Sequence, residues 1–459
     1  MPLRALILAA GKGTRMKSDL PKVIHPILQK PMISYVLDAV NLTKPDKTYI
    51  IVGYKKELIE GIADGSNFKV EYIVQNKQLG TGHAISRAES KLKSYTGDIL
   101  IINGDSPAIS GNELKKFIDK HRRNRSVLSL ITARVENPYG YGRIIQDSNS
   151  KIKSIVEEKD TSIEEKKINV VNSGIYCVRS KFLWEALKRL RLSNKQREYY
   201  LPDIVSHAVN NGHKVLNHNV ADHNEILGVN DKAELSELEG YIKSRVHKRL
   251  YRAGVTIVDP KSTFISPDAV IGTDSTIYPS TYIYGKSKIG KSCSIGPNVY
   301  IDDSVMGRNV EIRFSSYLNR CKIDNNVNVG PFAHLRPEAQ IGNDSKIGNF
   351  VEIKKSKIGS KSKVPHLSYV GDAVVGQNVN IGAGTITCNY DGVNKHQTVI
   401  EDNVFIGSDS MLVAPVKVGK GSTTAAGSTI TKDVDEYSLA IERNQQKIIK
   451  GWNKRKKKK

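Results

Sequence analysis

A glycine turn surrounded by basic side chains stands near the start of the chain. Residues 8–22 read LAAGKGTRMKSDLPK, in which a short apolar run ends at Gly11 and Gly13 and is followed by Arg15 and Lys22. Glycines let the backbone turn tightly, so that its N–H groups can face a phosphate, and the two cations add positive charge. The spacing matches neither the dinucleotide-binding nor the P-loop pattern, so the glycines alone would also fit a solvated loop.

A second set of reactive side chains lies in the C-terminal half. His366 stands within the segment VPHLSY, and Arg336, Lys354, Asn389 and Lys395 occupy other polar breaks in an aliphatic pattern. Acyl transfer to an amine requires that the ammonium lose a proton, and histidine suits that task because it titrates near neutral pH. A single histidine at a turn more often faces solvent, but the cations and amides around this one favour a catalytic role.

Aliphatic residues recur every six positions through much of the C-terminal half. The two runs are Ile265, Ile271, Ile277, Ile283, Ile289, Ile295 and Ile301, then Ile323, Val329, Leu335, Ile341, Ile347 and Ile353. A period of six means three short strands per coil, each with one residue pointing inward, which is typical of a parallel β-helix. From Gly254 to about Ile441 there is room for roughly ten coils of eighteen residues. The polar segment 388–396 interrupts the register and predicts a loop ejected from one corner.

The N-terminal half alternates strand-like and helix-like segments. Strands are expected at residues 3–10, 48–52, 70–74 and 98–102, and helices near 32–41, 54–63, 80–93 and 111–124. This alternation predicts an α/β domain with a parallel sheet, whose ligands bind beyond the carboxyl ends of the strands.

Four apolar residues between the two halves share one helical face: Leu235, Leu238, Ile242 and Val246. We therefore divide the chain into an α/β domain (1–230), a linker helix (231–253) and a β-helix domain (254–459) that ends in a basic tail (454–459).

Composition limits the classes of function. The 459 residues carry a formal net charge of +23, of which the tail supplies six charges. The positive charge that remains without the tail is suited to attracting anionic small substrates. The tail is interpreted as a solvated end, with nucleic-acid contact the weaker alternative. No apolar run is long enough to span a membrane, and four scattered cysteines without a CxxC pair indicate reduced thiols in a cytoplasm.

Three further segments extend the N-terminal pattern: QNKQLGTGH over 75–83, NGD over 103–105, and EEKD over 157–160 followed by NSG over 172–174. With residues 8–22 they resemble the nucleotide-, metal- and sugar-binding elements of sugar-1-phosphate nucleotidyltransferases. Together with the hexapeptide half, nearly the whole chain resembles the bacterial family of bifunctional N-acetylglucosamine-1-phosphate uridyltransferases and glucosamine-1-phosphate acetyltransferases. The resemblance implies a Rossmann-like nucleotidyltransferase domain followed by a left-handed parallel β-helix.

The resemblance also implies a role for each residue of the first site. Uridylyl transfer from UTP to N-acetylglucosamine-1-phosphate would give UDP-N-acetylglucosamine and pyrophosphate, with Arg15 and Lys22 as catalytic cations. Asp105 and Asn230 would hold Mg²⁺, although Asp105 alone could also cap the next helix. The nucleotide and sugar would be bound by Leu8, Ala9, Ala10, Gly11, Gly13, Lys22, Gln75, Gly80, Thr81, Gly140, Glu157, Asn172 and Asn230.

For the second site, the resemblance implies acetyl transfer from acetyl-coenzyme A to glucosamine-1-phosphate, with His366 as the general base. The sugar phosphate would be held by Arg336, Lys354, Tyr369 and Asn380. Acetyl-coenzyme A would be bound by Ala383, Asn389, Tyr390, Lys395, Ser408, Ala426 and Arg443. Departures from the family's commoner pattern include Asn103, Ser106 and Glu442.

The same resemblance implies a homotrimer. With the cysteines and the lack of a long apolar run, we expect a cytoplasmic protein without a membrane partner, and we favour small-molecule substrates over nucleic acid. Two other hypotheses remain open on the residues alone. One is a single-site sugar-1-phosphate nucleotidyltransferase whose β-helix is structural. The other is a non-catalytic regulatory subunit of the same architecture.

Overall fold

The computed structural model describes residues 1–65, 69–192 and 194–455, which form two compact units, Met1–Ile242 and Lys243–Lys459. Residues 456–459 of the basic tail lie outside the described residues. Within the described ranges, no helix is long and apolar enough to cross a membrane.

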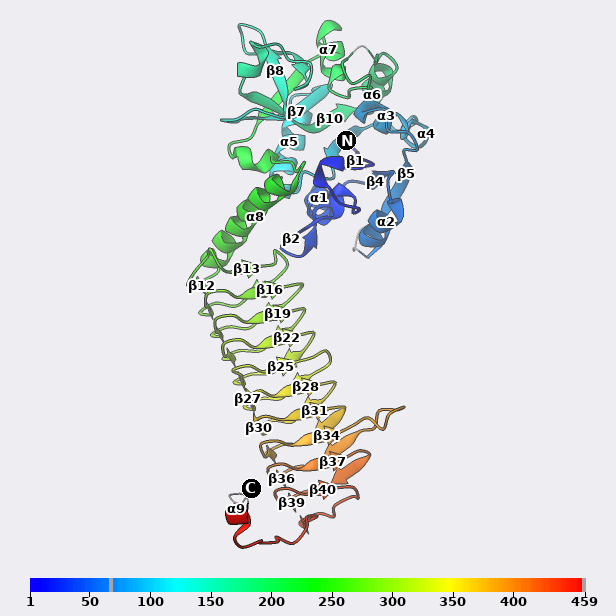
Figure 1. Ribbon diagram of the computed structural model, residues 1–459. Helices are drawn as coiled ribbons and strands as arrows, with labels where there is room; N and C mark the ends of the chain where they lie inside the picture. The colour runs from blue at the N-terminus through cyan, green and yellow to red at the C-terminus, as the bar shows by residue number, and fades with distance from the viewer. Residues whose placement is uncertain (66–68, 193, 456–459) are drawn as a thin grey trace. The chain divides into compact units, whose positions relative to one another are not determined.

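The first unit is built around a nine-stranded sheet with helices on its faces (Figure 1). Its strands are β1 (Leu3–Ala9), β4 (Lys47–Val52), β5 (Val70–Val74), β6 (Asp98–Asn103), β7 (Leu128–Arg134), β8 (Gly142–Gln146), β9 (Ile152–Val156), β10 (Val170–Arg179) and β11 (Val215–Asn219), and β2 (Pro26–Ile27) and β3 (Lys30–Pro31) form a separate hairpin. Its helices are α1 (Met32–Asn41), α2 (Lys56–Asp64), α3 (Thr81–Ser86), α4 (Glu89–Leu92), α5 (Gly111–Arg123), α6 (Ser180–Leu187) and α7 (Asp203–Asn210), with short 3-10 turns at η1 (Thr14–Met16), η2 (Lys22–Ile24), η3 (Glu165–Lys167) and η4 (His223–Ile226).

The four predicted strands are confirmed as β1, β4, β5 and β6, which pair in parallel in the order β6-β1-β4-β5. The predicted helix over 80–93 is divided into α3 and α4. The expectation of a wholly parallel sheet is wrong beyond Asn103, because β10 runs antiparallel to both β6 and β7. The chain reaches β10 from β7 through the β8–β9 hairpin, without a crossover helix, so it returns in the opposite direction.

Helix α8 (Lys232–Arg252) begins in the first unit and ends in the second. The second unit is a prism of stacked coils whose thirty short strands, among the described residues, form three parallel sheets, here called the first, second and third faces. The predicted ladder is confirmed, since every aliphatic residue from Ile265 to Ile353 in the two runs is at least nine-tenths buried. Each such side chain contributes about 1.5–3 kcal/mol of hydrophobic stabilisation.

The first face comprises β12 (Thr256–Ile257), β15 (Thr276–Ile277), β18 (Ser294–Ile295), β21 (Glu311–Ile312), β24 (Asn328–Val329), β27 (Lys346–Asn349), β30 (Lys363–His366), β33 (Asn380–Ile381), β36 (Phe405–Ile406), β39 (Thr423–Thr424) and β41 (Leu439–Ala440). The second face comprises β13 (Phe264–Ile265), β16 (Tyr282–Tyr284), β19 (Tyr300–Asp302), β22 (Tyr317–Asn319), β25 (His334–Leu335), β28 (Glu352–Lys354), β31 (Tyr369–Gly371), β34 (Ile386–Cys388), β37 (Met411–Val413) and β40 (Thr429–Ile430). The third face comprises β14 (Val270–Ile271), β17 (Lys288–Ile289), β20 (Val305–Met306), β23 (Lys322–Ile323), β26 (Gln340–Ile341), β29 (Lys357–Ile358), β32 (Ala373–Val375), β35 (Thr398–Ile400) and β38 (Val416–Val418), and the short helix α9 (Trp452–Arg455) follows the last coil.

One interruption of the prism was predicted from the broken register. Between β34 and β35 the chain leaves the coil as a loop, closed by a bridge between Tyr390 and Lys395 (Figure 1). The loop holds its own shape because the Asp391 carboxylate accepts hydrogen bonds from the backbone N–H groups of Val393 and Asn394.

Candidate active sites

The first candidate site lies beyond the carboxyl ends of β1, β5 and β6, the position expected for a ligand on a parallel sheet. The chain turns at Gly11 and Gly13 immediately after β1. Gly13 has a φ of 65°, and a Cβ there would meet the Cβ of Lys22 at 2.7 Å. A glycine is therefore needed for Lys22 to pack against this turn.

Four polar side chains converge above the turn. Arg15 donates from Nη2 to Oδ1 of Asn230 at 2.7 Å, and Lys22 donates to the same oxygen at 3.5 Å. Lys22 also forms an ion pair with Asp105. The helix-cap interpretation of Asp105 is wrong, because the α5 cap is Ser110, whose side chain accepts from the Glu113 N–H at 3.2 Å.

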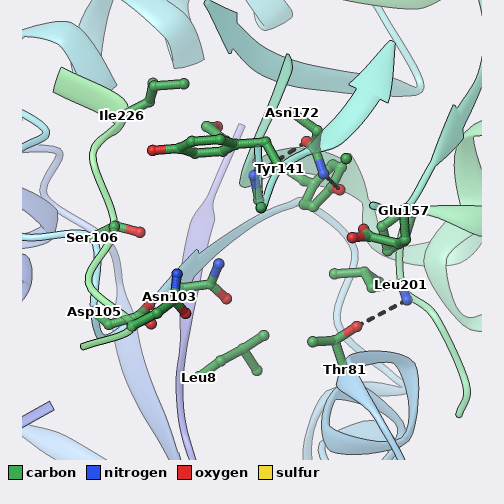
Figure 2. A pocket seen from close by; sticks show the side chains of 18 of the residues that line it. Leu8, Thr81, Asn103, Asp105, Ser106, Tyr141, Glu157, Asn172, Leu201 and Ile226 are labelled. Atoms are coloured by element: carbon green, nitrogen blue, oxygen red, sulfur yellow. Dashed lines mark hydrogen bonds between the residues drawn. The ribbon is translucent and has the colours of Figure 1, made fainter. Parts of the chain in front are cut away.

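Two adjoining cavities flank this cluster and share Leu8, Thr81, Asn103 and Asp105 in their walls. The first, of about 250 Å³, contains the predicted residues Gly140, Glu157, Asn172 and Asn230 in its lining. The second, of about 350 Å³, contains Ala9, Ala10, Gly11, Lys22, Gln75 and Gly80. The predicted residues of the first site line one or both cavities, except Gly13 and Arg15, which contact the lining residues Lys22 and Asn230. Figure 2 shows the first cavity, with Asp105 and Asn103 on one side and Glu157 and Asn172 on the other.

Several side chains at this site were not predicted from sequence. Gln78 donates to the Ala10 carbonyl at 2.6 Å and so fixes the end of the glycine turn. Glu234, in the first turn of α8, accepts from the Asn230 N–H at 2.6 Å. Both are ordinary surface residues by type and act through the backbone, so only the fold reveals them.

The second candidate site begins at the corner where the first face of the prism turns into the second, here called the histidine corner. Equivalent positions on successive coils hold Pro331, Asn349, His366, Ala383, Ser408 and Ala426. His366 is exposed, and its Nδ1 lies 2.6 Å from Oδ1 of Asn349. An amide oxygen only accepts, so Nδ1 carries the proton and Nε2 remains free to accept one.

The predicted sugar-phosphate residues Arg336, Lys354 and Tyr369 lie on the second face next to this corner. Arg336 donates to Glu352 at 2.8 Å, and Tyr369 pairs in register with Glu352. Lys354 lies 4.0 Å from the Asp372 carboxylate, which also accepts from Asn389 at 2.5 Å.

The ejected loop brings a second ammonium to this place. Lys395 lies beside Lys354 and lowers the pKa of that lysine, with partial burial as the next cause. Two ammonium groups held together repel each other, and an anion placed between them relieves that repulsion. The pair is therefore suited to a phosphate, which the loop sequence alone could not show.

The predicted coenzyme A residues Ala383, Ser408, Ala426 and Arg443 form one row below His366. The Ala383 carbonyl accepts from the Asp409 N–H at 2.6 Å, and the Ser408 carbonyl accepts from the Gly427 N–H at 2.8 Å. Arg443 donates to the Ala426 carbonyl at 2.9 Å. Glu442, the departure noted beside Arg443, lies 3.4 Å from the Thr429 N–H, at the end of the same row.

Asn380 is the one predicted sugar-phosphate residue that a single chain does not bring to the second face. It pairs with Lys363 on the first face, across the histidine corner from Arg336, Lys354 and Tyr369.

Comparison with known proteins follows the same division. Residues 4–224 match the nucleotidyl transferase family, residues 268–303 match the bacterial transferase hexapeptide repeat, and residues 317–430 match the GMPPB C-terminal domain. The chain is 49% identical to the bifunctional protein GlmU of Carboxydothermus hydrogenoformans, covering 97% of this chain and 98% of that protein. It is 46% identical to GlmU of an Exiguobacterium strain and 45% identical to GlmU of Syntrophomonas wolfei, each over 98% of this chain and 99% of the relative.

These matches extend over both units and both candidate sites. The first unit is a nucleotidyltransferase domain, and the prism is a left-handed parallel β-helix of hexapeptide repeats. The chain belongs to the bifunctional GlmU family of transferases.

Proposed function

We propose that the two transfers of this bifunctional enzyme take place at the two sites described above. The prism transfers acetyl from acetyl-coenzyme A to glucosamine-1-phosphate, and the first unit then transfers UMP from UTP to the N-acetylated product, giving UDP-N-acetylglucosamine and pyrophosphate. The observation that carries this division is that each unit contains its own group of polar side chains suited to one transfer: Arg15 and Lys22 in the first unit, and His366 with Asn349 in the second.

Uridylyl transfer needs positioning and charge neutralisation more than a protein nucleophile. The glycine turn would present its backbone N–H groups to the triphosphate. Arg15 and Lys22 would offset the charge that develops as the sugar phosphate oxygen attacks the α-phosphorus and pyrophosphate leaves. Gln75, Gly80 and Thr81 line the second cavity and would read the uracil and ribose.

The side chains of Asp105 and Asn230 fit a Mg²⁺ ion. Their oxygens already share a cation, because Lys22 pairs with Asp105 and also donates to Asn230. Within the described residues, no group of three or more His, Cys, Asp or Glu could hold a metal on its own. One carboxylate and one amide oxygen suit a magnesium ion that keeps waters and binds substrate phosphates. When bound, the ion would supply positive charge at the phosphates.

Acetyl transfer would begin with His366. Its free Nε2 would take a proton from the ammonium of glucosamine-1-phosphate, so that the amine can attack the thioester. Asn349 would hold the ring in the tautomer that leaves Nε2 unprotonated. Lys354, Arg336 and Tyr369 would bind the sugar phosphate, while Asn389, Tyr390 and Lys395 would bind acetyl-coenzyme A. Coenzyme A would follow the row from Ala383 to Arg443.

Assembly as a homotrimer would complete this site. Asn380 lies on a different face from Arg336, Lys354 and Tyr369, so a neighbouring prism must supply one set if all four are to meet. A ridge of apolar side chains also follows the histidine corner: Phe314, Phe332, Phe350 and Leu367 are between 43% and 61% exposed. Three of them hold positive φ angles, which bulky residues rarely adopt. An apolar ridge of this kind is typical of a surface that a partner covers.

We further propose the domain division given above, with the nucleotidyltransferase domain over 1–230, the linker helix over 231–253 and the β-helix over 254–459, and a cytoplasmic location.

A substrate-omission assay tests the function. UTP, acetyl-coenzyme A and glucosamine-1-phosphate are mixed with Mg²⁺, each is left out in turn, and products are identified by mass.

Free coenzyme A should appear without UTP, and UDP-N-acetylglucosamine only when all three are present. A single-site nucleotidyltransferase would release no coenzyme A, and a non-catalytic subunit would release no pyrophosphate from UTP and N-acetylglucosamine-1-phosphate. Either result would contradict the proposal.

A further inference from the structure

Glu157 occupies an unusual place for a glutamate. It follows β9 directly and points into the first cavity, near Asn172 and Leu201 (Figure 2). Its carboxyl lies against the backbone of Gly142, where an added Cβ would stand 3.2 Å from Oε1. The side chain is therefore packed against Gly142 at the wall of the cavity.

The groups around Glu157 are mostly acidic. Asp160 in the turn after β9 and Asp203 at the start of α7 both raise the pKa of Glu157. Tyr176 on β10 and Tyr200 before α7 also face it, and the pKa of each tyrosine is raised in part by the charge of Glu157.

A nearby cation, Arg143, is already engaged elsewhere. Arg143 on β8 forms an ion pair with Glu158 at 2.8 Å and donates to the Tyr141 carbonyl. Within the described part of the chain, no side chain forms an ion pair with Glu157. Burial is the largest cause and the acidic neighbours come next; together they raise the pKa of Glu157 to about 7, with Arg143 opposing them.

Asn172, on the same side of the cavity, already makes one hydrogen bond at each end of its amide, which leaves one N–H for a ligand. Asn172 donates from Nδ2 to the Tyr176 hydroxyl at 2.7 Å, and its Oδ1 accepts from the Gly174 N–H at 3.1 Å. A sugar that bears hydroxyls and an acetamido carbonyl needs hydrogen-bond donors from the protein. A protonated carboxyl supplies one donor and one acceptor, whereas a carboxylate only accepts.

We propose that Glu157 binds the sugar as an uncharged carboxylic acid that donates its O–H to a sugar oxygen, and that Asp160 and Asp203 are positioning residues that keep it protonated. This inference rests on the proposed function, because it assigns the first cavity to the sugar. Sugar affinity then becomes dependent on pH through a group that touches no phosphate.

The test is the affinity of the full-length protein for UDP-N-acetylglucosamine, measured by calorimetry between pH 6 and pH 8. The charge of its diphosphate does not change over this range. If only the protonated acid binds, the dissociation constant should rise about tenfold across that interval for a pKa of about 7. Glu157→Gln, which is neutral and still donates, should bind at all pH values with little slope.

Asp160→Asn keeps the oxygen that accepts from the Lys195 N–H but removes the charge. It should move the loss of affinity to lower pH. Glu136→Gln, which changes an exposed acid of the same unit, is the matched control and should follow the unaltered protein.

The outcomes distinguish a failure of the proposed function from a failure of the inference about Glu157. If UDP-N-acetylglucosamine does not bind at any pH, the proposed function fails. If it binds with an affinity that is flat with pH, or if Glu157→Gln abolishes binding at pH 6, Glu157 acts as a carboxylate and the inference is overturned. An Asp160→Asn profile that coincides with that of the unaltered protein, with both proteins folded by circular dichroism, would remove the role of the acidic neighbour.

Discussion

Replacing Lys22 by alanine separates the two activities most sharply. The Lys22 side chain is 18% exposed and packs on the Gly13 turn, so its charge is only partly screened by water. A lysine about 4 Å from a phosphate contributes about 4 kcal/mol at an effective dielectric of 20. Loss of that interaction in the transition state corresponds to roughly a thousandfold fall in kcat/KM for uridylyl transfer.

The same substitution should change the response to Mg²⁺ in the opposite direction. Lys22 pairs with Asp105, one of the two proposed metal ligands. Without that competing ammonium, half-saturation should require less Mg²⁺, even though the maximal rate is lower. A loss of activity through unfolding would not produce this combination.

Two assays measure these effects on one preparation: pyrophosphate release for uridylyl transfer and free thiol release for acetyl transfer. Acetyl transfer should remain within twofold of that of the unaltered protein. Lys116→Ala, which removes a 70% exposed lysine of the same unit, is the matched control. A fall of less than tenfold in uridylyl transfer, or a parallel loss of acetyl transfer in a folded protein, would refute the assignment.

Three further predictions concern the second unit. His366→Ala should lower acetyl transfer by about 10²–10⁴-fold, and Asn349→Ala should lower it less while changing the pH–rate profile, with uridylyl transfer unaffected in both. Phe350→Asp should convert the proposed trimer to monomers by light scattering and lower acetyl transfer alone, whereas Val270→Asp on the third face should do neither. Burial, with a smaller effect of a nearby lysine, lowers the pKa of His247 from 6.5 to about 4. As pH falls from 6.5 to 4, the unfolded chain binds a proton at His247 that the native chain does not bind. The free energy of unfolding should therefore fall by about 3 kcal/mol over that pH range. Urea unfolding at several pH values should show a weaker pH dependence in His247→Gln.

The sequence predicted most of the scaffold because its signals are local. The inward residue of each prism coil has an aliphatic side chain at a fixed interval, so the ladder from Ile265 to Ile353 could be read without any tertiary information. The break near residues 388–396 was visible for the same reason. The direction of β10 was not predictable in this way, because it depends on the β8–β9 hairpin that precedes it, and no local pattern distinguishes a strand reached by a hairpin from one reached by a helix.

Some residues of the candidate sites could be predicted from the sequence and others could not, for a similar reason. Residues that must be a particular type to do chemistry, such as Lys22 and His366, stood out by their type and their place in the pattern, and Asp105 was identified through the family resemblance. Residues that act through a neighbour did not stand out. Asn349 lies 17 positions before His366 and is an ordinary asparagine until the coil places its Oδ1 against the imidazole.

The ionisation of a side chain is the property furthest from the sequence. Glu157 was selected because its segment resembles a sugar-binding element, and that resemblance carries no information about its charge. Its charge depends on Asp203, forty-six positions away, and on Arg143, whose guanidinium is directed to Glu158. Burial and the acidic neighbours act together to raise the pKa of this carboxyl to about 7, so that it is partly protonated near neutral pH. A site residue identified by motif therefore acquires its chemical role from groups that the motif does not contain. The pH dependence proposed for Glu157 in the first cavity is the direct test of this statement.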